Sequence, residues 1–312
     1  ELRLLASSRS AGSEIEFMGK KHIVQEATAD SFKDIDIALF AGGSVSRDFA
    51  PHAVKAGAVV IDNSSTFRMD PDVPLVVPEV NPEAILKHKG IIANPNCSTI
   101  IMVMALKPIY DLARIKRIVV STYQAVSGAG KEGIDELTNQ VSDYCAGREM
   151  QANILPTTSM DRHYPIAFNL IPQIDVFLDN LYSKEEMKMV NETRKIFDDY
   201  EMRITATTVR VPVYRSHSES VNIELEKDVD LETIRRAIAQ FPGVQLQDEP
   251  TAQVYPMPLY TSDKNDVYVG RLRRDESCDN AVNLWVVGDQ IRKGAALNTL
   301  QIAETMIKNG WL

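Results

Sequence analysis

The stretch IDIALFAGGSVSRDFAPHAVKAGAVVIDNSS, residues 35–65, decides the fold of the first part of the chain. Two short apolar runs, 35–43 and 58–65, flank a helix candidate from Ser46 to Ala56, which Gly57 ends. Two more runs of the same kind follow, PLVVPEV (74–80) and GIIANPN (90–96). Short apolar strands that alternate with helices predict a parallel sheet covered on both faces. This is the α/β, doubly wound, Rossmann-type arrangement, in which ligands lie beyond the carboxyl ends of the strands.

The opening residues, ELRLLASSRSAG (1–12), read as the second strand of such a fold rather than the first. We therefore expect the native protein to carry one further βα unit of roughly 30 residues ahead of Glu1, with the Gly-rich phosphate loop. After this strand come three hydroxyls and a guanidinium, Ser7, Ser8, Arg9 and Ser10, with no acidic residue. A guanidinium binds a 2′-phosphate, whereas an acidic group binds a free ribose hydroxyl, so the stretch favours NADP over NAD. An ordinary polar loop is the alternative.

Beyond Ser98 the pattern changes to segments rich in Val, Ile and Thr mixed with helices, which predicts a second, α+β domain with a mixed or antiparallel sheet. The predicted strands are 117–127, 204–213, 220–226, 267–273 and 283–288, and the predicted helices are 134–141, 184–197 and 231–241. The tail 294–312 predicts a helix that Gly310 ends and that packs on the first domain. Its expected buried stripe is Ala296, Leu300, Ala303 and Ile307. The expected division is a dinucleotide-binding domain, 1–97, completed by 293–312, and a catalytic and dimerisation domain, 98–292.

Composition excludes several classes of function. A chain of 312 residues favours two domains, and a formal net charge of −9 without a dense basic tract argues against nucleic-acid binding. No apolar run approaches the roughly 18 residues that a membrane span needs. Three distant cysteines predict free thiols in a reducing, cytoplasmic compartment, and the cysteines and histidines show no metal-chelating spacing.

Cys97 is the first candidate for chemistry. In NPNCSTI (94–100) it stands between an Asn-Pro-Asn turn and the start of an apolar helix. Unsatisfied N–H groups and the positive end of the helix dipole favour a thiolate at such a position, which predicts a nucleophile. The alternative is a buried cysteine that packs as a small apolar residue.

His217 is the candidate base for Cys97. If the segment after it is a strand, His217 shares a buried face with Glu219, Val221, Ile223 and Leu225. By the same alternation Arg210 lies on the face of Ala206 and Thr208, which suggests that it binds an anion such as a substrate carboxylate. The alternatives are a hydrogen-bonded core histidine and a structural ion pair.

Five segments in this order and spacing, NPNCSTI, YQAVSGAG, EEMKMVNET, RVPVYRSHSES and GAALNTLQIAE, closely resemble aspartate-β-semialdehyde dehydrogenases over nearly the whole chain. The resemblance implies an NADP-dependent reductive dephosphorylation in lysine, methionine and threonine biosynthesis. Aspartyl phosphate acylates the cysteine, phosphate leaves, NADPH reduces the thioester, and aspartate semialdehyde is released. The resemblance also implies a homodimer or a dimer of dimers.

The same resemblance implies roles for individual residues. Cys97 matches the nucleophile, His217 the acid/base and Gln124 the residue that holds the acyl intermediate. Arg210 matches the group that binds the substrate α-carboxylate, and Glu185 the group that faces its amino group. The implied phosphate neighbours are Arg68, Asn96 and Lys188, and the implied cofactor contacts are Ser127, Gly128 and Asn298. The other candidate cofactor contacts are Ser7, Ser8, Arg9 and Ser10, from the stretch after the opening strand, and Gly42. The alternatives are a solvated helix pair for Glu185 and Lys188, and a loop anchor for Arg68.

Two other functions remain open at this point. One is a reductase of another acyl phosphate, such as an N-acetylglutamyl phosphate, in which Glu185 would meet no free amino group. The other is a non-catalytic or inactive, truncated relative that serves as a binding subunit.

Overall fold

A three-stranded parallel sheet forms the centre of the first part of the molecule. The computed structural model describes residues 2–312, and in it β5 (Ile37–Phe40), β6 (Val59–Asp62) and β7 (Ile91–Ala93) pair in that order. The helix α1 (Ser46–Lys55) connects β5 to β6 and packs on β6 through Ala50 and Ala53, which are fully buried. The strand–helix–strand unit predicted from 35–65 is therefore confirmed.

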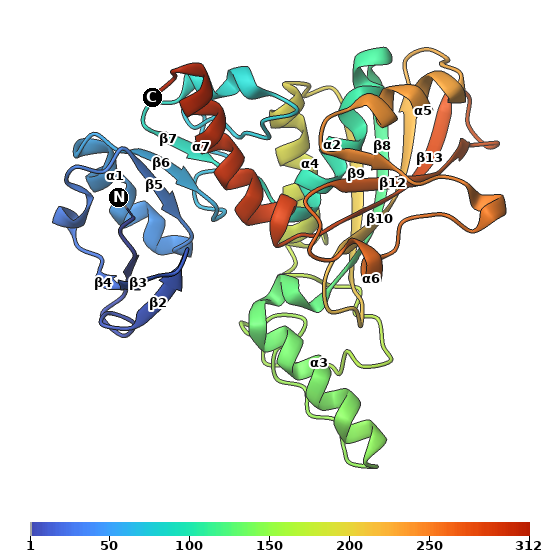
Figure 1. Ribbon diagram of the computed structural model, residues 1–312. Helices are drawn as coiled ribbons and strands as arrows, with labels where there is room; N and C mark the ends of the chain where they lie inside the picture. The colour runs from blue at the N-terminus through green and yellow to red at the C-terminus, as the bar shows by residue number, and fades with distance from the viewer. Residues whose placement is uncertain (1) are drawn as a thin grey trace.

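The predicted opening strand is much shorter than its sequence suggested. β1 (Leu5–Ala6) pairs in parallel with β4 (Gln25–Glu26), apart from the three-stranded sheet. Between them lies an exposed hairpin of β2 (Glu14–Phe17) and β3 (Lys20–Ile23). Figure 1 shows this hairpin and α1 at one end of the molecule.

The strand predicted at 74–80 is wrong. This segment makes one parallel bridge, from Leu75 to Ala93, and then turns, because the N–H of Val77 bonds to the side chain of Asn81 rather than to a neighbouring strand. Its two prolines have no N–H to contribute to a ladder. The segment is nonetheless buried, with Val76 and Val77 fully inaccessible. The apolar run thus marked burial and not strand pairing.

A six-stranded mixed sheet forms the second part of the molecule. Its order is β11-β12-β13-β10-β8-β9, in which β8 runs parallel to β9 and β11 parallel to β12, while the other pairs are antiparallel. The mixed sheet predicted from the sequence is therefore confirmed. The strands are β8 (Ile115–Gln124), β9 (Arg203–Arg210), β10 (His217–Leu225), β11 (Val244–Leu246), β12 (Val267–Arg274) and β13 (Ala281–Gly288).

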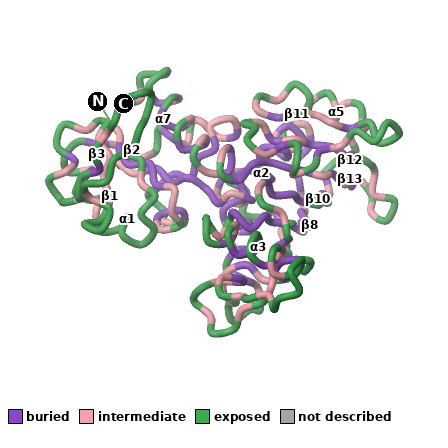
Figure 2. The backbone as a smooth tube through the Cα atoms, turned by 60° about the horizontal axis from the view of Figure 1, so that its bottom comes forward, coloured by how far each residue is buried: buried purple, intermediate pink, exposed green. Residues whose placement is uncertain are grey.

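The helix α2 (Cys97–Leu112) forms the centre of the core. It packs on β8, β12 and β13, and eleven of its sixteen residues are buried. Figure 2 shows the buried chain concentrated along α2 and the strands beside it. The remaining helices are α3 (Gly130–Cys145), α4 (Lys184–Phe197), α5 (Leu231–Gln240) and the short α6 (Pro258–Thr261). Of these, α3 projects away from both sheets (Figure 1).

The last helix, α7 (Leu297–Asn309), returns to the three-stranded sheet (Figure 1). Ile302, Ala303 and Met306 pack with residues of β6 and β7, and Gly310 ends the helix in the left-handed conformation. Of the predicted stripe only Ala303 is buried, because Ala296 is exposed and Leu300 and Ile307 are 49% and 60% exposed. Polar Asn298 and Thr299 are buried in their place, since hydrogen bonds satisfy them. No helix within residues 2–312 has the length and apolar character to cross a membrane.

Candidate active site

Cys97 is the first residue of α2. The side-chain oxygen of Asn96 accepts hydrogen bonds from the N–H groups of Ser98 and Thr99, at 3.1 and 3.2 Å, and so caps the helix. Asn96 itself has extended backbone angles, which turn the chain out of the strand β7 and into α2. The position predicted for the thiol, at the mouth of a helix, is therefore confirmed.

The charge state predicted for that thiol is wrong for the free protein. Burial and, after it, the nearby carboxylate of Glu185 raise the pKa of Cys97 to about 12. Arg68, Arg210 and the Ser98 N–H lower this pKa, but their combined effect is smaller. The helix terminus therefore does not by itself produce a thiolate, because desolvation opposes the charged form more strongly.

Three predicted residues meet at the carboxylate of Glu185, in the first turn of α4. Its Oε1 accepts from the amide of Asn96 at 3.0 Å and from the amide of Gln124 at 3.3 Å. Its Oε2 accepts from Lys188 Nζ at 3.1 Å. Lys188 and these donors hold the pKa of Glu185 at about 2 although burial opposes them, so the carboxylate is ionised. Glu185 is buried, so the solvated helix pair considered from the sequence is excluded.

His217 and Arg210 lie on buried strand faces, as the alternation predicted. Both bind the backbone of Ala125: its N–H donates to His217 Nδ1 at 3.1 Å, and its carbonyl accepts from Arg210 Nη1 at 2.7 Å. Burial and the charge of Arg210 lower the pKa of His217 to about 3. Two buried donors, Arg210 Nε and His217 Nε2, have no hydrogen-bond partner among residues 2–312. Buried donors are rarely left unpaired, so this pair fits an anionic ligand.

Hydrogen bonds link Cys97 and His217 in one site. Asn96, which precedes Cys97, and Gln124 both bind Glu185, and Ala125, which follows Gln124, binds His217. Two close backbone approaches also define this site. A Cβ at Gly128 would lie 2.7 Å from Arg210 Nη1 and 3.4 Å from His217 Nε2, and one at Gly294 would lie 3.0 Å from the Cβ of Cys97. Only glycine fits at these two positions without displacing the side chains of the site.

Arg68 reaches the same region from the loop after β6. It donates from Nε to the carbonyl of Asn94 at 2.9 Å and from Nη2 to the carbonyl of Asn63 at 3.1 Å. Its Nη1 donates to Glu192 at 3.1 Å. The loop-anchor alternative is thus supported by the structure, although Arg68 also lies close enough to lower the pKa of Cys97.

Sequence reasoning missed two buried residues that organise the site. Glu192 binds both Arg68 and the N–H of Asn96. Gln290 binds the hydroxyl of Ser127 and accepts from the N–H of Ser216, the residue before His217. Neither could be found from a short motif, because their partners are remote in sequence and two of the four partner groups are backbone N–H groups.

The other predicted cofactor residues lie elsewhere. The exposed turn from Ser7 to Ser10 follows β1, closed by a hydrogen bond from Ser10 N to the Ser7 carbonyl at 2.9 Å, and it includes Ser8 and Arg9. Gly42 is exposed after β5. Asn298 is fully buried, and its amide donates to the carbonyl of Val76 and to Asn94 Oδ1 while its oxygen accepts from Lys293. The described residues 2–312 contain no group of three His, Cys, Asp or Glu arranged to hold a metal ion.

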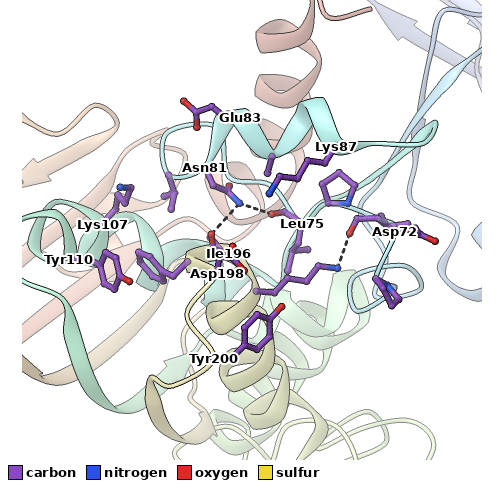
Figure 3. Close-up of a pocket in the computed structure, with 17 residues that line it drawn as sticks. Asp72, Leu75, Asn81, Glu83, Lys87, Lys107, Tyr110, Ile196, Asp198 and Tyr200 are labelled. Carbon is purple, nitrogen blue, oxygen red and sulfur yellow. Dashed lines mark hydrogen bonds between the residues drawn. The ribbon is translucent and has the colours of Figure 1, made fainter.

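A cavity of about 610 Å³ is lined by a different set of residues (Figure 3). It opens between the loop 71–87 and the carboxyl end of α4, and Tyr110 and Lys195 contribute to its wall. None of the predicted site residues lines it. Asn81, which points into this region, is satisfied by Leu75 and Ile196 carbonyls, so the cavity shows no unpaired polar group of Asn81 for a ligand.

Comparison with known proteins gives the family. Residues 1–88 match a family described as semialdehyde dehydrogenase, NAD binding domain, and residues 106–293 match semialdehyde dehydrogenase, dimerisation domain. Aspartate-semialdehyde dehydrogenase of Aquifex aeolicus is 54% identical, over 99% of this chain and 91% of the relative. The chain belongs to the aspartate-semialdehyde dehydrogenase family. The enzyme of Bacillus subtilis is 53% identical, over 98% of this chain and 89% of the relative.

The fold agrees with this family. The crystal structure of aspartate semialdehyde dehydrogenase II from Vibrio cholerae, described as complexed with ASA, superposes with a TM-score of 0.93 at 48% identity. The match covers 99% of this chain and 90% of that one. Like other aspartate-semialdehyde dehydrogenases, the chain thus combines a Rossmann-type domain for a nicotinamide cofactor with a dimerisation domain that contains the mixed sheet.

Proposed function

We propose that this chain catalyses the NADPH-dependent reductive dephosphorylation of L-aspartyl 4-phosphate to L-aspartate 4-semialdehyde, through a thioester on Cys97. The observation that carries this function is the pair of unpaired buried donors, Arg210 Nε and His217 Nε2, in one site with the ionised Glu185. A cation and an anion near one thiol complement the carboxylate and the ammonium of a free amino acid.

Arg210 binds the substrate α-carboxylate and Glu185 its ammonium group. Arg210 keeps one donor on the carbonyl of Ala125 and leaves Nε free, so it is already oriented before the substrate arrives. Glu185 is held by Asn96, Gln124 and Lys188, which keep it ionised. The γ-acyl group of the substrate then faces Cys97.

Acylation begins when the sulfur of Cys97 attacks the acyl carbon and the bond from that carbon to the phosphate oxygen breaks. Because burial holds the Cys97 proton in the free protein, the departing phosphate takes up this proton. Gln124, which is buried beside Glu185, holds the acyl intermediate. Asn96, Lys188 and the remaining N–H groups of Arg68 surround the phosphate, and Lys188 also binds Asp175 at 3.2 Å.

His217 acts as the acid of the second half-reaction. Its Nδ1 accepts from Ala125, so its proton is on Nε2, and this N–H donates to the carbonyl oxygen of the thioester. Bound NADPH supplies a hydride. The Nε2 proton moves toward the oxygen that gains charge and returns to His217 as the carbonyl re-forms. The carbon–sulfur bond then breaks, the aldehyde is released, and the sulfur of Cys97 takes up a proton from water.

Residues after β1 favour NADP over NAD. Arg9 is exposed and has no ion-pair partner within residues 2–312, so its guanidinium is free for a 2′-phosphate, and Ser7, Ser8 and Ser10 add hydroxyls. Gly42, Ser127, Gly128 and Asn298 complete the proposed cofactor set. In Arg9→Ala, kcat/KM for NADPH should fall by at least tenfold while that for NADH stays unchanged. An equal loss with both cofactors would reject this specificity.

We also propose that the boundary between the two domains follows Cys97. Residues 1–97 and 293–312 then form the cofactor domain, and residues 98–292 form the catalytic domain. The packing of α7 on β6 and β7 supports this division. The assembly is a homodimer or a dimer of dimers, which sedimentation velocity of the purified protein would decide. Three free cysteines support a cytoplasmic location, which cell fractionation would test.

The reaction itself is tested in the reverse direction. Wild type should reduce NADP in the presence of phosphate and L-aspartate 4-semialdehyde, and Cys97→Ala should abolish this reduction. N-acetylglutamate 5-semialdehyde should not be a substrate, because it has no free ammonium group for Glu185. Turnover of the N-acetylated aldehyde at a comparable kcat/KM would favour the alternative reductase, and phosphate-independent turnover by Cys97→Ala would reject the thioester.

A further inference from the structure

Glu192 lies at the junction of α4, the Asn94–Asn96 turn and the loop that carries Arg68. It is 1% exposed and stands seven residues after Glu185 on α4. Seven residues are about two helical turns, so both carboxylates are on one face of the helix. One face of α4 therefore presents two acidic groups to the residues around Cys97.

Each carboxylate oxygen of Glu192 accepts a hydrogen bond from a different donor. Oε2 accepts from the backbone N–H of Asn96 at 2.6 Å, and Oε1 accepts from Arg68 Nη1 at 3.1 Å. Burial raises the pKa of Glu192, while Arg68 and the N–H of Asn96 oppose this rise. A protonated carboxyl would have to place its own O–H against one of these two donors, so the contacts favour the ionised form. Glu192 thus holds the main chain of the residue directly before Cys97.

Arg68 extends this support to the other end of the turn, since its Nε donates to the carbonyl of Asn94 at 2.9 Å. The Glu192–Arg68 ion pair therefore forms hydrogen bonds to the backbone at both Asn94 and Asn96. The charge of Arg68 also lowers the pKa of the Cys97 thiol. An ionised Glu192 beside Arg68 offsets part of that effect.

We propose that Glu192 is a positioning residue of this active site, which fixes the backbone of Asn96 ahead of Cys97 and neutralises part of the Arg68 charge that reaches the thiol. The kinetic consequence rests on the proposed function, but the effect on thiol reactivity does not. Two consequences separate this role from general stability. Loss of the Glu192 charge should make Cys97 more reactive, while loss of its two hydrogen bonds should make turnover slower.

The test is Glu192→Gln in a Cys145→Ser/Cys278→Ser background, so that iodoacetamide reports on Cys97 alone. Removal of the Glu192 charge should increase the thiolate fraction of Cys97, and the weaker nucleophilicity of a thiolate of lower pKa should offset part of the gain in rate. Alkylation at pH 8 should therefore be roughly threefold faster than in the same background with Glu192. In Gln an NH2 group, which only donates, replaces one of the two oxygens that now accept from Asn96 and Arg68, so kcat should fall by at least roughly tenfold.

Glu186→Gln is the matched control. Glu186 is also buried on α4, and it accepts from two backbone N–H groups, those of Ser183 at 2.7 Å and Thr208 at 3.0 Å. Alkylation of Cys97 in Glu186→Gln should be as fast as in the background protein. Unchanged alkylation in Glu192→Gln, or equal acceleration in Glu186→Gln, would overturn the proposal.

Glu192→Asp provides a second variant if Glu192→Gln does not fold. It keeps the charge and shortens the side chain by one methylene, so alkylation should stay near the background rate while kcat falls. Circular dichroism checks the fold of each variant. A wild-type kcat in Glu192→Asp would overturn the positioning role. Because alkylation needs no turnover, its outcome is independent of whether the proposed reaction is correct.

Discussion

The N–H of Ala125 donates to Nδ1 of His217 over 3.1 Å, and this single bond fixes the tautomer of the imidazole. A backbone N–H cannot accept, so Nδ1 is unprotonated and the neutral ring carries its proton on Nε2. The carbonyl of the same residue binds Arg210. The backbone of one residue therefore orients both the acid and the carboxylate-binding group, and it leaves one donor of each without a partner among residues 2–312.

We predict that His217 stays neutral, with its proton on Nε2, from pH 5 to pH 9. Burial and Arg210 lower its pKa to about 3, far below this range. Nitrogen-15 spectra of histidine-labelled protein should show a pH-independent Nε2–H signal that is missing in His217→Gln. This variant should also lose roughly 10²–10⁴-fold in kcat. A titration near pH 6.5, or a proton on Nδ1, would contradict the assignment.

We predict that Cys97 makes the fold sensitive to alkaline pH. Its pKa is raised from 9.0 to about 12, so the unfolded thiol ionises above pH 9 while the folded thiol does not. The stability that this group contributes is present below pH 9 and is lost as the pH rises, at up to about 1.4 kcal/mol per pH unit.

Urea unfolding at pH 8 and pH 10 measures this loss. The free energy of unfolding should fall less between the two pH values in Cys97→Ala than in the wild type. The control, Cys145→Ala, changes an exposed cysteine at the end of α3 and should behave as the wild type. Identical pH dependence in all three proteins would contradict the raised pKa.

Most of the fold could be predicted because its strands and helices differ clearly in their apolar patterns. The unit 35–65 and the helix at 184–197 formed where the pattern placed them. The strand predicted at 74–80 was wrong because an apolar run indicates burial equally in a strand and in a buried loop. The two prolines of this segment disfavour a strand. The buried face of α7 was predicted wrongly because Asn298, whose amide is satisfied by hydrogen bonds, is buried while Leu300 is exposed.

The site was predictable where a residue type is unusual for its place. Arg210 and His217 on buried faces, and Cys97 at a helix start, are conspicuous without a structure. The thiol charge was not predictable, because it depends on how far desolvation exceeds the nearby positive charges. Glu192 had one available signal, its two-turn spacing from Glu185, but its partners are a backbone N–H and a distant arginine.

We predict that Glu219→Gln stabilises the protein at neutral pH. Both oxygens of Glu219 are buried without a partner among residues 2–312, and burial raises its pKa well above the usual value. The unfolded carboxyl ionises above about pH 4.5 while the folded one stays protonated, so wild-type stability falls as the pH rises from there. Gln has the same shape and no proton to lose.

Urea unfolding at pH 5 and pH 8 should show an advantage of Glu219→Gln that grows with pH. Glu224→Gln on the same strand is the control, for which we expect the free energy of unfolding to change in the opposite direction. Lys116 binds Glu224 at 2.8 Å and the pKa of that carboxyl is lowered, so its removal should reduce stability at pH 8. A Glu219→Gln advantage that is the same at both pH values would show that Glu219 is ionised in the folded protein.

We predict that Glu185 selects substrates with a free ammonium group. Its carboxylate is held ionised with a pKa of about 2, and a charged hydrogen bond of this kind contributes about 1.5–3 kcal/mol. Glu185→Gln should therefore raise KM for L-aspartate 4-semialdehyde by roughly ten- to hundredfold in phosphate-dependent NADP reduction. The neutral amide should also narrow the difference in kcat/KM between this aldehyde and its N-acetyl derivative.

Glu186→Gln, which changes the neighbouring carboxylate that binds Ser183 and Thr208, should leave the difference in kcat/KM unchanged. Should Glu185→Gln lower kcat/KM equally for both aldehydes, Glu185 would support Asn96 and Gln124 rather than recognise the substrate amine.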